Sequence, residues 1–197
     1  MDVVVESVKL ASELHRCQRK KKSIVPDIPY MGHLMEVAGI VQANGGDDVT
    51  VAAALLHDAI EDQGTEAREQ IREKFGPEVL DIVEACTESE TFPKPPWKER
   101  KEAYLKLVEM ASLPVLLVMV ADKLQNGRAL LRRLKLEGEE GWGKPCREEK
   151  LWYIQSLLEA MRCRLVQLEQ ETDQPTLVSL SLLIDEYAEV VEALAHY

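Results

Sequence analysis

The stretch Val51-Ala-Ala-Ala-Leu-Leu-His57-Asp58-Ala-Ile-Glu61-Asp62 combines two kinds of chemistry in one segment. Its first half is apolar on every side, which predicts a helix that is buried all round. Its second half places one histidine and three carboxylates where this helix ends. Burying carboxylates is costly unless partners or a cation compensate, so we expect a divalent metal here. The alternative is a chance His57-Asp58 pair next to a solvated helix end.

The composition limits the classes of function that remain. With 197 residues, the chain can form one domain with a substantial core and is small for two. Its formal net charge of -11 argues against a general binder of nucleic acid or anionic membranes, because such binding requires a basic surface. We therefore expect a small-molecule partner, and an anionic ligand would need local cations or a metal.

The cysteines and the N-terminal residues bear on the compartment. The four cysteines are widely spaced and include no C-x-x-C pair, so we expect reduced thiols and no cysteine zinc site. The first residues carry charges and do not resemble a signal peptide, and no apolar run approaches the ~18 residues of a membrane span. We expect a cytoplasmic protein that does not enter the membrane.

Apolar residues recur at helical spacing along most of the chain, and glycine and proline separate the segments. The expected helices are 2–18, 30–43, 49–62, 66–75, 77–86, 97–110, 115–136, 146–169 and 176–195. Periodicity alone does not decide between strand and helix for the run after Pro114, but the helix formers that follow it favour a helix.

These segments predict an all-α bundle of about eight to ten helices around a buried metal site. We expect residues 1–197 to form a single domain with a core at about 8–165. The last helix, 176–195, is expected to pack on this core; the alternative is packing on a second subunit, so a homo-oligomer remains open.

Metal-competent side chains occur on three of the buried helices. They are His33, His57 with Asp58, and Asp122. Two imidazoles and two carboxylates suit a borderline or hard divalent ion such as Mn²⁺ or Fe²⁺ and leave coordination positions open. Cysteine, which would favour zinc, is absent from the set.

Five motifs, in consistent order and spacing over about residues 8–160, carry a resemblance to a known family. They are Tyr30-Met-Gly-His33, Ala53-Ala-Leu-Leu-His57-Asp58-Ala-Ile-Glu61-Asp62, Phe75-Gly76, Trp97-Lys-Glu-Arg-Lys101 and Ala121-Asp122-Lys-Leu-Gln-Asn126. The H…HD…D pattern is that of the HD superfamily of metal-dependent phosphohydrolases. The five motifs together resemble the hydrolase domain of RelA/SpoT-type proteins, most of all the small stand-alone members.

The resemblance implies both a metal site and a reaction. The metal, usually Mn²⁺ with Fe²⁺, Mg²⁺ or Zn²⁺ as alternatives, would be held by His33, His57, Asp58 and Asp122. Glu61 and Asp62 would activate or orient the metal-activated water that attacks the 3′-pyrophosphate of guanosine 3′-diphosphate 5′-di- or triphosphate, (p)ppGpp. The products would be pyrophosphate and GDP or GTP.

Substrate contacts are expected at six further residues. Arg19 and Lys20 match a family Q-x-R-K element, Asn126 and Tyr153 match nucleotide-contacting positions, and Lys98 and Lys101 add positive charge. Each contact has an alternative. The run from Arg19 to Lys22 could be solvated, and Lys98 and Lys101 could lie on an exposed helix face. Asn126 could form a local hydrogen bond, and Tyr153 could belong to the core. His15 is expected to be structural.

The chain departs from the family pattern at three places. Leu34 replaces a proline, Gln125 replaces a histidine, and the segment between Arg19 and His33 is longer. These changes leave the expected ligands intact but alter the pocket around them. The alternative function is therefore an HD phosphohydrolase for ppApp, a dNTP, a nucleoside 5′-phosphate or the 2′-phosphate of NADPH. A binding module without turnover is a third hypothesis, which the acidic pair disfavours because it would repel a polyanion.

Overall fold

The structure, a computed structural model, describes residues 2–20, 25, 27–89, 91, 93–172 and 174–197. All regular elements within these ranges are helices, so the all-α prediction is confirmed. They are α1 (Val3–Leu14), α2 (Met31–Ala43), α3 (Asp48–Leu56), α4 (Ala59–Gln63), α5 (Thr65–Cys86), α6 (Trp97–Glu109), α7 (Leu113–Glu137), the 3₁₀ helix η1 (Gly138–Trp142), α8 (Arg147–Glu171) and α9 (Thr176–Ala195). None of the described helices is both long and apolar enough to cross a membrane.

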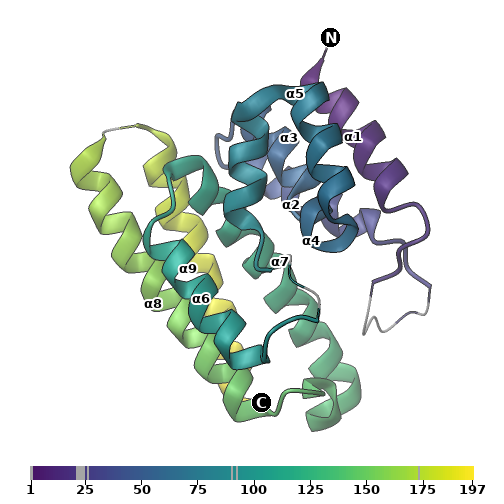
Figure 1. The fold of residues 1–197 in the computed structure, drawn as a ribbon. Helices are drawn as coiled ribbons and strands as arrows, with labels where there is room; N and C mark the ends of the chain where they lie inside the picture. Colours follow the sequence, from purple (N-terminus) through teal and green to yellow (C-terminus); the bar gives the residue numbers. More distant parts are fainter. Residues whose placement is uncertain (1, 21–24, 26, 90, 92, 173) are drawn as a thin grey trace.

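Helix α7 runs between two groups of helices (Figure 1). It contacts α2, α3 and α5 on the N-terminal side of the molecule and α8 and α9 on the other side. Its first half, from Val115 to Ala121, is buried on every face. This all-round burial explains the continuous apolar run, and the choice of a helix over a strand for this segment is correct.

The helix expected at 49–62 is interrupted, because α3 ends at Leu56 and α4 begins at Ala59. Asp47 caps α3 by accepting the Thr50 N–H at 2.8 Å. At the other end, His57 Nδ1 lies 2.7 Å from the carbonyl oxygen of Ala54, which would accept the Asp58 N–H in a continuous helix. The histidine side chain therefore enters the backbone hydrogen-bond ladder at this break.

A second boundary follows the expected pattern of glycine and proline. Gly76 has a φ of 75°, outside the helical region, and it kinks α5 just before Pro77. The left-handed conformation suits glycine, and the proline then occupies the start of the second helical segment. The two helices expected at 66–75 and 77–86 are therefore both present within α5 and meet at this kink.

Helix α9 closes the second group of helices by packing on α7 and α8. Its buried face includes Leu180, Leu183 and Tyr187, which belong to the same hydrophobic core as the residues of α7. Gly127 of α7 lies against α9, and a Cβ atom at this position would lie 2.7 Å from Val190 Cγ1. Glycine thus permits the contact between the two helices.

The close approach predicts that Gly127→Ala lowers the free energy of unfolding by up to about 2 kcal/mol. Overpacking costs about 1–3 kcal/mol, which outweighs the gain of about 1 kcal/mol in helix propensity. Urea denaturation of Gly127→Ala, of Val190→Ala and of the double variant measures the coupling free energy between the two positions. Additive effects of the two substitutions would contradict the contact, because removing the valine methyl groups should make room for the new Cβ.

Candidate metal centre and active site

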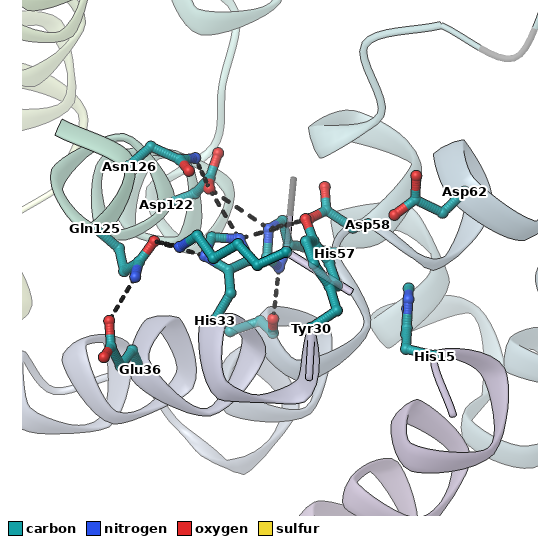
Figure 2. Close-up of polar contacts among 12 residues, drawn as sticks. His15, Tyr30, His33, Glu36, His57, Asp58, Asp62, Asp122, Gln125 and Asn126 are labelled. Atoms are coloured by element: carbon teal, nitrogen blue, oxygen red, sulfur yellow. Dashed lines mark hydrogen bonds and ion pairs between the residues drawn. The ribbon is translucent and has the colours of Figure 1, made fainter. Parts of the chain in front are cut away.

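Two imidazoles and two carboxylates from α2, the α3–α4 junction and α7 converge at one point (Figure 2). His33 Nε2 lies 3.5 Å from Asp58 Oδ2 and 3.3 Å from Asp122 Oδ1. His57 Nε2 lies 3.1 Å and 3.7 Å from the same two oxygens. The ligand atoms of His33, His57 and Asp58 all lie within 4.8 Å of one another, and Asp122 joins this group through its contacts with the two imidazoles.

Hydrogen bonds on the far side of each ring orient the two imidazoles. His57 Nδ1 faces the Ala54 carbonyl oxygen, and His33 Nδ1 faces Gln125 Oε1, both at 2.7 Å. Each Nδ1 must carry the proton to donate to an oxygen, which leaves the lone pair of Nε2 directed at the carboxylates. His57 Nε2 is buried and has no hydrogen-bond partner in the described part of the chain.

The charges of the cluster account for the direction of its pKa shifts. Burial alone would lower the pKa of His33 and His57, but hydrogen bonds and charges from Asp58 and Asp122 outweigh it, so both pKa values are raised. Burial alone would raise the pKa of the two carboxyl groups, but the imidazoles, and for Asp122 above all Lys123, hold both well below their usual range. The cluster thus requires positive charge at its centre.

A divalent cation fits this set of donors. Lone pairs of two nitrogens and two carboxylate oxygens face one another, an arrangement that is unfavourable unless a positive charge lies between them. Ligand atoms about 2.1 Å from a shared ion lie roughly 3.0–3.4 Å apart at octahedral or tetrahedral angles. The nitrogen–oxygen distances of 3.1–3.7 Å in the cluster are close to that range. Nitrogen and oxygen donors without sulfur suit a borderline or hard metal.

Three further side chains contact the two carboxylates, and the sequence analysis assigned no role to two of them, Tyr30 and Lys123. The Tyr30 hydroxyl donates to Asp58 Oδ2, and Lys123 Nζ lies 2.6 Å from Asp122 Oδ2. Asn126 Nδ2 donates to Asp122 Oδ1 at 2.5 Å, so the asparagine does form a local hydrogen bond. Helical spacing was an available signal, because Tyr30 precedes His33 by three positions on one face.

The predicted catalytic pair lies outside the four-residue cluster. Asp62 Oδ2 accepts a hydrogen bond from Gln18 Nε2 at 2.7 Å, and Glu61 Oε1 pairs with Lys94 Nζ at 2.6 Å. Figure 2 draws Asp62 without a direct contact to the cluster. Both carboxylates belong to α4, which starts immediately after Asp58, so this short helix connects them to the predicted metal ligands.

The six predicted substrate contacts differ in where they lie. Lys20 Nζ donates to Gln125 Oε1 at 2.8 Å, next to the predicted metal ligand His33. Arg19 is exposed and donates to the backbone carbonyls of Arg16 and Gln18. Lys21 and Lys22, expected to be solvated, lie outside the described residues.

The two lysines of α6 that were predicted to contact the substrate, Lys98 and Lys101, have different surroundings. Lys101 pairs with Glu88, and its Nζ lies 4.8 Å above the ring of Tyr153. Burial and the nearby Lys123 lower the pKa of Lys101, against the charge of Glu88. Lys98 is exposed and lies over Trp152, away from the cluster. Of these two lysines, only Lys101 is therefore placed next to the site.

A cavity of about 220 Å³ adjoins the cluster between α6, α7, α8 and α9. Its lining includes Lys101, Lys123, Asn126 and Tyr153. The Tyr153 hydroxyl is buried and without a hydrogen-bond partner among the residues described, and burial raises its pKa. A larger cavity, of about 600 Å³, is lined by residues from α3, α5, α7 and α9 and includes no residue of the cluster. The smaller one is therefore the candidate substrate pocket.

Two of the departures from the family pattern have a structural account. Leu34 is fully buried in the core, so it changes packing rather than the ligand set. The ends of the longer segment are joined by backbone hydrogen bonds, from the Lys20 N–H to the Ile28 carbonyl and from the Tyr30 N–H to the Gln18 carbonyl. These bonds hold the two ends together next to His33 despite the added length.

Comparisons with known proteins agree with this site. Residues 7–140 match the HD domain family. The chain is 35% identical over 162 residues to the guanosine-3′,5′-bis(diphosphate) 3′-pyrophosphohydrolase MESH1 of Xenopus tropicalis, covering 81% of this chain and 85% of that protein. It is 32% identical over 169 residues to human MESH1, covering 85% and 89%. A solved metazoan SpoT orthologue that hydrolyses ppGpp superposes with a TM-score of 0.72 at 27% identity, covering 96% of this chain and 95% of that one.

The fold and the cluster define an HD-domain protein. The chain belongs to the HD-domain family, in the group of stand-alone RelA/SpoT-like hydrolases that includes these relatives. The resemblance inferred from the five motifs is thereby confirmed.

The raised histidine pKa values predict how divalent-cation binding depends on pH. Metal ligation requires neutral imidazoles, so protons compete with the ion, and affinity should rise with pH until both histidines have lost the competing proton. Because both values lie above the ordinary 6.5, the rise should extend above pH 6.5. Calorimetry with Mn²⁺ in two buffers of different ionisation enthalpy counts the released protons, and about one to two are expected near pH 6. Binding without proton release there would contradict the raised pKa values.

Proposed function

We propose that this protein is a metal-dependent 3′-pyrophosphohydrolase that converts (p)ppGpp to pyrophosphate and GDP or GTP. The observation that carries the proposal is the four-residue cluster with an acidic pair on the next helix and a lysine-lined cavity beside it. The names of relatives that align over most of their own length support the same reaction. We further propose that residues 1–197 act as one domain in the cytoplasm.

The proposed ion is Mn²⁺, held by His33, His57, Asp58 and Asp122. When bound, it would supply a Lewis acid that acidifies water and offsets the charge of the phosphates. The Nδ1 atoms stay bonded to oxygens of the protein, so in each neutral imidazole the lone pair is on Nε2 and is directed inward.

Glu61 and Asp62 are proposed to orient the attacking water and accept its proton. Gln18 holds Asp62 and Lys94 holds Glu61, so both carboxylates have fixed orientations on α4. A carboxylate is an effective base when it reaches the water at hydrogen-bond distance. The proton passes from the water to the acidic pair as the water oxygen bonds to phosphorus. The bond from phosphorus to the ribose 3′-oxygen breaks, and this oxygen takes up a proton to leave as the 3′-hydroxyl.

The cavity between α6 and α8 is proposed to take the nucleotide. The chain is acidic overall, yet the cavity lining includes Lys101, Lys123 and Lys150. Burial makes the Lys101 charge costly, and an anionic phosphate would compensate for it. Asn126 and Tyr153 offer polar groups on the same wall. Lys20 adds a cation next to Gln125, whereas Arg19 and Lys98 would need to reorient to contact the substrate.

Replacing the acidic pair should separate chemistry from metal binding. We expect Glu61→Gln with Asp62→Asn to lower kcat by about 10²–10⁴-fold, the typical contribution of a general base. Mn²⁺ affinity should stay within a few-fold, because neither carboxylate contacts the cluster. The assay is pyrophosphate release from ppGpp after metal stripping and Mn²⁺ reconstitution, with His57→Ala as the variant that loses the metal.

Two results of that assay would count against the proposal. Full hydrolysis by the double variant would show that neither carboxylate assists the water. Orthophosphate release, found in a panel with dNTPs, nucleoside 5′-phosphates and NADPH, would move the protein to another substrate within the HD family.

The buried hydroxyl of Tyr153 yields a prediction about the nucleotide pocket. If the substrate supplies its missing hydrogen-bond partner, Tyr153→Phe should raise the KM for ppGpp by about 2–13-fold, the equivalent of 0.5–1.5 kcal/mol for one hydrogen bond. The melting temperature of the free protein should not fall, because the variant loses no internal hydrogen bond. Steady-state kinetics with Tyr197→Phe as the control test this. An unchanged KM would assign Tyr153 to the core.

A further inference from the structure

Gln125 connects three parts of the chain next to the metal cluster. It lies on α7 three positions after Asp122, and its side chain is buried. Its Oε1 lies 2.7 Å from His33 Nδ1 and 2.8 Å from Lys20 Nζ, and its Nε2 donates to Glu36. Figure 2 shows Gln125 between Glu36 and the ring of His33.

The charged neighbours decide which end of the amide faces His33. An ammonium group only donates hydrogen bonds, and an ionised carboxylate only accepts them. Lys20 therefore requires the amide oxygen on its side, and Glu36 requires the amide NH₂ group on the other. A flipped amide would oppose NH₂ to the lysine and oxygen to the carboxylate, so it would lose both bonds.

The orientation of the amide in turn decides the tautomer of His33. Facing Oε1, the Nδ1 atom must carry the proton, and Nε2 then presents a lone pair to the centre of the cluster. Facing an NH₂ group, Nδ1 would have to be the acceptor, and the proton on Nε2 would block a metal. The tautomer of His57 does not depend on a side-chain amide, because its Nδ1 faces a backbone carbonyl that cannot flip.

We propose that Gln125 is the positioning residue of the metal centre, and that the Lys20–Glu36 pair orients its amide so that His33 is held ready to bind the ion. The inference rests on the metal site of the proposed function. It assigns a role to a residue at which the chain departs from the family pattern, and it links Lys20, a proposed substrate contact, to a metal ligand through one oxygen atom.

The test is Mn²⁺ binding to the purified full-length protein, measured by calorimetry without substrate. Gln125→Met keeps the length of the side chain but removes the amide, and it should weaken Mn²⁺ binding by about 10–100-fold, as loss of a ligand's hydrogen-bond partner typically does. Exchanging the two side chains, by Gln125→Glu with Glu36→Gln, preserves every hydrogen bond. The new carboxylate accepts from His33 and Lys20, and the new amide at position 36 donates to it. This double variant should bind Mn²⁺ within a few-fold of the wild type.

The control is Gln155→Met, which makes the same change at an exposed position of α8. Thermal unfolding of the metal-free variants checks that the fold persists. If Gln125→Met does not fold, Gln125→Asn retracts the amide by one methylene and should still weaken binding relative to Gln155→Met.

Each outcome bears on a separate claim. Unchanged affinity in Gln125→Met or Gln125→Asn overturns the positioning role, as does an exchanged double variant that binds no better than Gln125→Met. A wild-type protein that binds no Mn²⁺ overturns the metal assignment instead. Tight binding without hydrolysis of ppGpp overturns only the proposed substrate.

Discussion

The structure depends on the meeting of two imidazole lone pairs and two carboxylates inside a helical bundle. Such groups repel one another unless a positive charge lies among them, and burial makes that repulsion costly. In the free protein, the raised pKa values of His33 and His57 mean that protons meet part of this demand. A bound divalent ion would offset this repulsion more completely. The same arrangement that destabilises the free protein therefore favours binding of a cation.

Helix α7 makes the arrangement rigid. Four neighbouring residues of this helix contribute to the site. Asp122 faces the cluster, and Lys123 neutralises its carboxylate. Gln125 orients His33, and Asn126 borders the cavity. Helices pack against α7 on both sides, so these four side chains keep a fixed relation to one another. The proposed metal ligands and the candidate nucleotide pocket are thereby coupled through a single element.

Positive charge near the site is held in place by buried carboxylates. Glu88 is largely buried and pairs with both Arg100 and Lys101, and Asp122 pairs with Lys123. Lysines that face a cavity in an acidic protein therefore need not move far to meet a phosphate. The pairing also separates Lys101 from Lys98, which has the same charge three positions earlier but faces solvent and Trp152.

The sequence by itself determined the helical class and most helix limits, because apolar periodicity, Asp47 and the Gly76-Pro77 pair act locally. It also indicated the four residues of the cluster, because ionisable side chains within apolar helices are costly to bury and are concentrated at functional sites. Only the tertiary structure decided the break after Leu56, the contacts of Tyr30 and Gln125, and which of the lysines on α6 lies next to the cavity. These features depend on contacts between residues far apart in the chain, such as Gln125 with His33 and Lys20, and no local pattern encodes which helix faces meet.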